Sequence, residues 1–221
     1  MSAARIILFD VNETLLDLQP LKTAVNNLLK NDNAFQQWFG QLLQYSLVDN
    51  CTNNYHDFVA IAAAALNMTA TNNGKKITET DTTNTLQFIK KLMPHADVIP
   101  GLTLLKNSGF RLATLSNSPL QTSLAQLAFA KIDQYFEAIL SVDAVKKYKP
   151  SPEPYIYAAE TLKVSVGEIM MVAAHGWDIA GAAHVGMQTA FINRPFQSVY
   201  PLAKQPTYNE NNILLLAKKL I

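Results

Sequence analysis

Ile6-Ile-Leu-Phe-Asp-Val-Asn-Glu-Thr-Leu-Leu-Asp17 is the stretch that decides the fold, because it joins a short apolar run to a cluster of polar residues. The four apolar residues Ile6–Phe9 have the composition of a fully buried β-strand. Asp10 follows this run directly, and Asn12 and Thr14 come shortly after it. Ligands of open α/β sheets bind just beyond the ends of the strands, so the sequence predicts a site at Asp10.

The second half of the chain repeats this pattern, because apolar, β-prone runs alternate there with helical patterns. The expected strands are residues 6–9, 111–115, 138–141, 169–172 and 188–192. The expected helices of this half are residues 101–108, 120–130, 152–162, 178–184 and 212–220. Right-handed crossovers between such elements predict an α/β fold with a Rossmann-like, doubly wound parallel sheet.

Residues 17–97 break the alternation, since they offer helical patterns without a convincing strand. The patterns cover residues 21–29, 34–48, 55–66 and 78–92, and turn-forming residues lie between them. We therefore expect a helical cap at 17–97, inserted into a Rossmann-like core made of residues 1–16 and 98–221.

Composition excludes several classes of protein. The 221 residues are 49% hydrophobic, which is enough for a well-buried core, and a formal net charge of +1 without basic blocks makes nucleic acid an unexpected partner. The apolar run before Asp10 is too short for a signal sequence or a membrane span, so we expect a soluble chain. Cys51 is the single cysteine, which excludes an intramolecular disulfide and makes the cytoplasm the default compartment.

Polar residues follow four of the expected strands, and the carboxyl ends of parallel strands meet at one edge of a sheet. One acidic residue after a strand usually only caps the next helix, but several strand ends with polar residues favour a functional site. The residues concerned are Asp10, Asn12, Thr14, Ser116, Asn117, Lys149, His175 and Asp178.

These residues lie in motifs that resemble the haloacid dehalogenase superfamily over essentially the whole chain. The motifs are Phe9-Asp-Val-Asn-Glu-Thr-Leu-Leu-Asp17, Leu115-Ser-Asn117, Tyr148-Lys-Pro150 and Trp177-Asp178. The chain looks most like the type II (S)-2-haloacid dehalogenases, through Ser141-Val-Asp-Ala-Val-Lys-Lys-Tyr-Lys-Pro150, Tyr155, Trp177-Asp-Ile-Ala-Gly181 and Ile192-Asn-Arg-Pro195. The resemblance implies a Rossmann-like core whose site is closed by a helical cap.

The resemblance and the chemistry of the residues together point to a covalent hydrolase. A carboxylate nucleophile, Asp10, would divide a difficult displacement into the formation and the hydrolysis of an ester. Lys149 would keep Asp10 ionised, although a surface lysine before a proline turn is the alternative. Thr14, Ser116, Asn117 and Tyr155 are expected near the substrate. Their alternatives are a helix cap for Thr14, a turn residue for Ser116 and a buried packing residue for Tyr155.

Phosphoryl transfer is the main competing chemistry of the superfamily, and two absences argue against it. The phosphatases that the chain resembles have a second aspartate two residues after the nucleophile, where this chain has Asn12, which cannot act as an acid. They also bind Mg²⁺ through an acid four residues before the position of Asp178, and this chain has Ala174 there. We therefore expect a metal-independent enzyme without a cofactor.

The chain also departs from the dehalogenase pattern. Phe39 stands in the expected cap where the family has an arginine that receives halide and substrate carboxylate; with Trp38 it would form a weakly polar halide cradle, or belong to the core. Anion binding would then depend on backbone amides near 11–14 and on Ser116 and Asn117. Ala173 and His175 replace the usual serine and asparagine.

His175 is the departure with the largest chemical consequence. A histidine at a strand end is often structural, but a neutral imidazole beside an ester can also deprotonate water near neutral pH. Glu13 stands where the family has glycine and would either orient the His175 ring or be solvated. Asp178 is the alternative base, and Trp177 is expected behind the site.

Three hypotheses follow. The first is a hydrolase that converts short (S)-2-haloalkanoic acids to 2-hydroxy acids, with the haloacid and water as its partners. The second is a phosphatase for small phosphate esters, and the third is a binding protein of the same fold that has lost turnover. The family resemblance is compatible with a homodimer, and no membrane partner is expected.

Overall fold

The computed structural model describes residues 5–221, which separate into two compact units. The first unit contains the chain up to Asp17 and Met93–Ile221, and the second is Leu18–Leu92. The sequence placed these boundaries after residues 16 and 97. The contacts extend the first unit because Asp17 N donates to Met93 O and His95 N donates to Leu15 O, so the two connecting segments pair with each other there.

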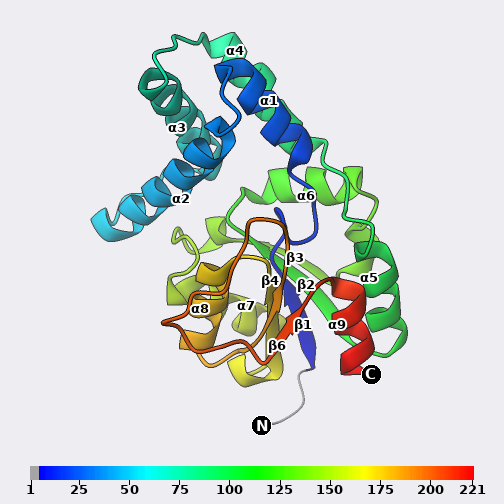
Figure 1. The fold of residues 1–221 in the computed structure, drawn as a ribbon. Coiled ribbons are helices and arrows are strands. Elements are labelled where there is room, and N and C mark those ends of the chain that lie inside the picture. The colour runs from blue at the N-terminus through cyan, green and yellow to red at the C-terminus, as the bar shows by residue number, and fades with distance from the viewer. Residues whose placement is uncertain (1–4) are drawn as a thin grey trace. The chain divides into compact units, whose positions relative to one another are not determined.

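A six-stranded parallel sheet forms the centre of the first unit, in the order β3-β2-β1-β4-β5-β6 (Figure 1). This confirms the doubly wound, Rossmann-like fold. The strands are β1 (Ile6–Phe9), β2 (Arg111–Ser116), β3 (Ala138–Ser141), β4 (Ile169–Ala173), β5 (Gln188–Ile192) and β6 (Tyr208–Glu210). The sequence did not predict β6, because Tyr-Asn-Glu has no apolar run to indicate a strand.

Helices cover both faces of this sheet. They are α5 (Val98–Asn107), α6 (Leu120–Phe129), α7 (Pro152–Leu162), α8 (Gly176–His184) and α9 (Ile213–Leu220). Apolar residues of α7 and α8, such as Tyr155 and Ile179, form one buried cluster with Ile6 and Leu8 of β1. Helices α5 and α9 pack side by side (Figure 1). They lie so close that a side chain at Gly101 of α5 would be only 2.8 Å from the side chain of Ile213 in α9.

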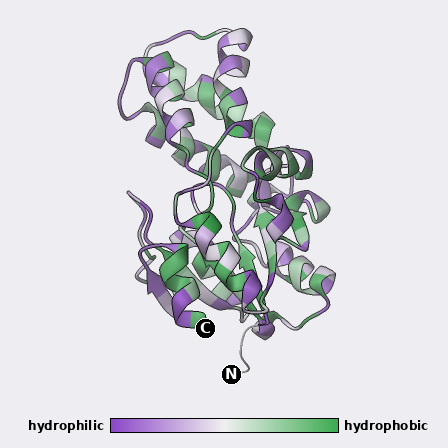
Figure 2. Cartoon of the chain, turned by 90° about the vertical axis from the view of Figure 1, so that its right-hand side faces the viewer, coloured by the Kyte–Doolittle hydropathy of each residue, from purple (hydrophilic) through white to green (hydrophobic). Residues whose placement is uncertain are grey.

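The helices of the first unit are amphipathic, as expected for elements that pack on a sheet with one face. In Figure 2 hydrophobic and hydrophilic residues alternate along them. Helix α9, for example, buries Ile213, Leu216 and Ala217 and keeps Lys218 in solvent. The helices predicted at 101–108 and 178–184 begin earlier than expected, at Val98 and Gly176.

The second unit is entirely helical. Its helices are α1 (Gln19–Leu29), α2 (Ala34–Thr52), α3 (Phe58–Asn72) and α4 (Glu79–Leu86), followed by a 3₁₀ turn at Gln87–Lys90. Helices α2 and α3 pack together, and Trp38 Nε1 donates to Ala62 O across them at 2.9 Å. The helix expected at 55–66 is displaced because the Asp57 carboxylate caps it, accepting from the amides of Val59 and Ala60.

None of the helices in residues 5–221 is both long enough and apolar enough to span a bilayer. The single cysteine, Cys51, is exposed on α2.

Candidate active site

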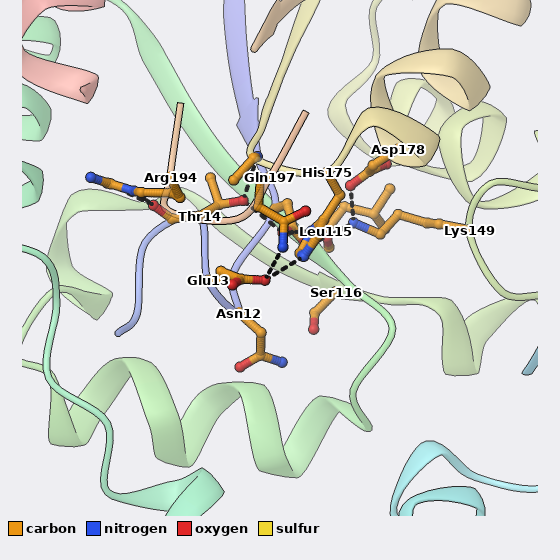
Figure 3. A network of polar contacts seen from close by, with 12 residues as sticks. Asn12, Glu13, Thr14, Leu115, Ser116, Lys149, His175, Asp178, Arg194 and Gln197 are labelled. Carbon is orange, nitrogen blue, oxygen red and sulfur yellow. Dashed lines mark hydrogen bonds and ion pairs between the residues drawn. The ribbon is translucent and has the colours of Figure 1, made fainter. Parts of the chain in front are cut away.

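Asp10 lies at the centre of a buried polar network in the first unit, directly after β1. Its amide donates to Val172 O of the neighbouring strand β4, so the end of the sheet fixes its backbone. Strand β1 lies between β2 and β4, where the strand order reverses and open α/β sheets bind their ligands. Figure 3 shows side chains from the ends of several strands around this point.

Lys149 lies on one side of Asp10, between two carboxylates. Its ammonium donates to Asp10 Oδ1 at 2.9 Å, to Asp178 Oδ2 at 2.6 Å and to Leu115 O at 2.9 Å, so all three of its protons are used. The side chain is fully buried. The surface-lysine alternative for Lys149 is therefore wrong.

Tyr155 completes this side of the network. Its hydroxyl donates to Asp178 Oδ1 at 2.6 Å, so both oxygens of the fully buried Asp178 accept hydrogen bonds. A side chain at Gly181 would lie 2.6 Å from the Tyr155 hydroxyl, which explains the need for glycine at that position. With both oxygens occupied, Asp178 is placed to hold Lys149, and burial is the largest cause that raises the pKa of Asp178.

Thr14 binds the other oxygen of Asp10. Its hydroxyl donates to Asp10 Oδ2 at 2.7 Å and accepts the amide proton of Ala174 at 2.9 Å. Thr14 is fully buried and precedes no helix directly, so the helix-cap alternative for it is wrong.

His175 also approaches Asp10 Oδ2, from the end of β4. Its Nδ1 lies 3.2 Å from that oxygen, and its Nε2 lies 3.0 Å from Glu13 Oε2 (Figure 3). Both partners are carboxylates that only accept, so the imidazole donates from both nitrogens and is cationic. Burial alone would lower the pKa of His175, but the hydrogen bonds and charges of Asp10 and Glu13 outweigh burial and raise it to about 9.

This charge state corrects the expectation that His175 is neutral near physiological pH. Glu13 is likewise a direct partner of His175 and not a solvated residue. The Trp177 ring stacks on the imidazole with ring centroids 5.0 Å apart.

The electrostatics of Asp10 follow from its neighbours. Burial acts to raise the pKa of Asp10, but the charges and hydrogen bonds of Lys149 and His175 together hold it well below its usual range. Burial likewise acts to lower the pKa of Lys149, and the charges of Asp10 and Asp178 raise it. The nucleophile candidate is therefore ionised and the adjacent lysine is charged.

Glu13 has an unusual backbone conformation. Its φ is +65°, a left-handed value that suits the glycine found here in the resembled family better than a glutamate. The carbonyl of Glu13 lies 3.0 Å from His95 Nε2, and its carboxylate accepts a second hydrogen bond, at 2.9 Å, from Gln197 Nε2. The sequence reasoning missed Gln197 and His95, because both lie far from Glu13 in the chain.

Arg194 is a further residue that sequence reasoning left without a role. Its guanidinium donates to Thr14 O and pairs with both oxygens of Asp97, and the residue is buried. Arg194 comes just after β5, at the same edge of the sheet as Asp10, and this position in the sequence could have identified it as a candidate site residue.

Three expected substrate-binding residues lie at the edge of the network. Asn12 donates to Ser118 Oγ and accepts from Gln126 Nε2, so its amide points toward α6 (Figure 3). Ser116 Oγ accepts the amide proton of Ser118, as the turn alternative proposed. Asn117 Oδ1 accepts from Lys149 N, and its buried Nδ2 has no partner within residues 5–221.

Phe39 belongs to α2 of the second unit. Its ring stacks on Phe35 with centroids 5.7 Å apart and an interplanar angle of 8°, and it is half-buried. In the part of the chain that the structure describes, no group of three or more His, Cys, Asp or Glu side chains is arranged to hold a metal ion.

Known proteins resemble this chain along its full length. The family model described as haloacid dehalogenase-like hydrolase matches residues 4–186. The (S)-2-haloacid dehalogenase 4A of Burkholderia cepacia is 28% identical, over 100% of this chain and 98% of that protein. The (S)-2-haloacid dehalogenase 1 of Pseudomonas sp. (strain CBS-3) is 30% identical, over 88% of this chain and 86% of that protein.

A solved structure of L-2-haloacid dehalogenase from Xanthobacter autotrophicus, with chloropropionic acid covalently bound, has the same fold. It superposes with a TM-score of 0.91 at 24% identity, and the match covers 97% of each chain.

Proposed function

The chain belongs to the haloacid dehalogenase-like hydrolases, and from this membership we propose that it hydrolyses the carbon–halide bond of short (S)-2-haloalkanoic acids to give 2-hydroxy acids. The names of the relatives from Burkholderia cepacia and Pseudomonas support this substrate class. The observation that carries the mechanism is the Asp10 carboxylate, which is buried yet kept ionised between Lys149 and His175.

In the first step Asp10 is the nucleophile. One carboxylate oxygen attacks C2 of the haloacid from the side opposite the halogen, a C–O bond forms, and the bonding pair leaves with the halide. Lys149 and Thr14 hold the two oxygens in place, so little orientational freedom is lost in the transition state. Attack from the opposite side inverts the configuration at C2.

Esterification changes the charge beside His175. The anionic oxygen of Asp10, which helps to raise the pKa of His175, becomes part of a neutral ester. The pKa of His175 then falls, with burial still acting against its charged form. The imidazolium releases its proton to solvent and becomes a base only after the ester exists.

In the second step His175 takes a proton from a water that attacks the ester carbonyl carbon. The acyl C–O bond breaks, the remaining proton of the water passes to the leaving alkoxide, the 2-hydroxy acid leaves, and Asp10 returns as a carboxylate beside an imidazolium. The cycle consumes one haloacid and one water and releases one hydroxy acid, one halide and one proton, so atoms and charges balance. Glu13 remains on the opposite nitrogen and keeps the ring oriented throughout.

Substrate anions are bound without a cap arginine. Asn117 supports this, because its buried Nδ2 is a donor that lacks a partner within residues 5–221 and adjoins the chain segment of Lys149. Ser116 and the backbone amides near 11–14, other than Glu13 N, which already donates to Leu16 O, would supply further donors.

Phosphatase activity is the weaker alternative for this site. Asn12 occupies the position of the phosphatase acid, and its amide is held by Ser118 and Gln126. Neither the amide chemistry nor the direction of this side chain suits protonation of an alcohol leaving group.

The test is halide release from a panel of 2-haloacids, measured with and without a chelator and beside generic phosphate esters with Mg²⁺. We expect chelator-resistant release from short (S)-2-haloacids and none from the (R)-enantiomers. Asp10→Ala is the control for site chemistry and should release no halide above background. A strict Mg²⁺ requirement, or phosphate release faster than halide release, would favour the phosphatase.

A further inference from the structure

A strained turn follows β5 and delivers two side chains to the active site. Gln197 N donates to Arg194 O at 3.1 Å, which closes a four-residue turn with Pro195 at its second position. Phe196, the third residue, has a φ of +66° and is 86% exposed. This is the φ pattern of a type II turn, whose third position favours glycine, so a bulky phenylalanine there is a backbone outlier.

The two ends of the turn bind consecutive residues of the segment after Asp10. Arg194 donates to Thr14 O, and Gln197 Nε2 donates to Glu13 Oε2 at 2.9 Å (Figure 3). Thr14 in turn binds Asp10, whereas Glu13 binds His175. One short turn therefore supports both the nucleophile and its histidine neighbour, through separate side chains.

The segment after the turn is fixed against the start of α8. A side chain on Gly176 would lie 2.5 Å from Ser198 O and 2.8 Å from Tyr200 N, so this backbone lies directly against the residue after His175. The chain that follows Gln197 and the chain that follows His175 are thus packed against each other.

The chemistry of an amide suits this position. Gln197 and His175 both approach the same oxygen, Glu13 Oε2, and a carboxylate oxygen accepts two donors. A neutral donor fixes the carboxylate without cancelling the negative charge that His175 requires. A lysine or arginine at residue 197 would instead form an ion pair and compete for that charge.

We propose that Gln197 is a positioning residue that holds the Glu13 carboxylate on His175, so that the imidazole is oriented for hydrolysis of the Asp10 ester. The kinetic part of this inference rests on the proposed function, but the contact geometry does not. The positive φ of Phe196 is part of the turn that places Gln197 on Glu13.

The first experiment measures the titration of His175 by NMR of carbon-labelled imidazoles, in a chain with only four histidines. The charged groups that face His175 are Asp10 and Glu13, with Lys149 and Asp178 behind Asp10. Gln197→Met keeps the length but removes the donor, so Glu13 is released and the titration midpoint should fall by about one pH unit.

Gln197→Asn, which keeps the amide but shortens its reach, should lower the midpoint in the same way. The matched control is Gln205→Met, because Gln205 lies exposed on the same loop and binds only backbone carbonyls of that loop. It should titrate like the wild type. An unchanged midpoint in both Gln197 variants would overturn the proposal.

The second experiment separates the two chemical steps by rapid-mixing measurement of halide release. Gln197→Met should keep the rate of the first turnover and lower the steady-state kcat about tenfold, without an increase in KM. Equal losses in the first and later turnovers would also overturn the proposal. If no haloacid is turned over at all, the proposed function fails, while the NMR titration still tests Gln197.

Discussion

The two sides of Asp10 differ in burial and in the chemistry they support. On the Oδ1 side, Lys149, Asp178 and Tyr155 are almost wholly buried and saturate one another with hydrogen bonds. On the Oδ2 side, His175 is buried, but its partner Glu13 keeps 17% of its side chain exposed and is held by a loop residue.

Because of this difference, we expect the charge of Lys149 to be constant and the charge of His175 to be variable. Lys149 faces two carboxylates, and in the proposed Asp10 ester it would still face Asp178, so we expect it to stay charged throughout. His175 depends on Asp10 and on the half-buried Glu13, so its protonation can change within a catalytic cycle. In the proposed mechanism, the Oδ1 side holds Asp10 in place and the Oδ2 side changes its protonation when Asp10 is esterified.

Lys149→Met should have the largest effect. It leaves Asp10 and Asp178 buried without their shared cation, which we expect to destabilise the fold by about 3–5 kcal/mol and to lower kcat/KM by at least about 10³-fold. Urea unfolding and halide release measure the two effects. Lys204→Met, at an exposed lysine, is the control. A fully stable and active Lys149→Met would show that Asp10 does not need the charge of Lys149 on its Oδ1 side.

The pH dependence of the free energy of unfolding should reveal the raised pKa of His175. Because folding raises the pKa of His175 from 6.5 to about 9, its contribution is complete below pH 6.5 and is lost as the pH rises through about 9. The shift corresponds to about 3 kcal/mol. Urea unfolding at about pH 6 and about pH 10 should show a decrease of this order in the wild type that His175→Gln lacks. Equal decreases in both proteins would contradict the raised pKa.

Glu13→Gln should affect the second step alone. It removes the partner charge of His175, so the pKa of His175 falls and the ring loses its orientation, while Lys149 and Thr14 still hold Asp10. We expect kcat to fall about tenfold to thirtyfold with an intact first turnover. Glu153→Gln, on the exposed face of α7, is the matched control. A slower first turnover would place Glu13 in ester formation instead.

Ser116→Ala should have the smallest effect. The hydroxyl of Ser116 accepts a hydrogen bond from the amide of Ser118, and its own proton is available to a substrate anion. Loss of one such hydrogen bond raises KM about threefold to tenfold with little change in kcat. A steady-state assay with a short haloacid measures this, and an unchanged KM would exclude Ser116 from anion binding.

The Oδ1 side could be anticipated from the sequence, and the Oδ2 side only in part. Asp10 and Lys149 stand in motifs after strands, so sheet topology alone brings their segments together. The contact between His175 and Glu13 depends on the left-handed φ at Glu13, which no pattern in a single sequence reports.

The contact between Gln197 and Glu13 is still harder to predict from the sequence. The two residues lie 184 positions apart in the chain, and a turn brings them together. Strand β6 escaped prediction for a different reason, because its pairing with β5 is provided by the backbone and not by an apolar run. Side chains that act through tertiary contacts are thus harder to foresee than those that end a buried strand.

In the proposed mechanism, Asp10 carries an ester whose hydrolysis requires His175. The most direct test is the mass of the Asp10 peptide after His175→Ala has been mixed with an (S)-2-chloro acid and quenched. We predict release of one equivalent of halide and an increase in mass by the carboxyalkyl group, absent from Asp10→Ala. Complete turnover by His175→Ala with an unmodified Asp10 peptide would show that hydrolysis of the ester does not require His175.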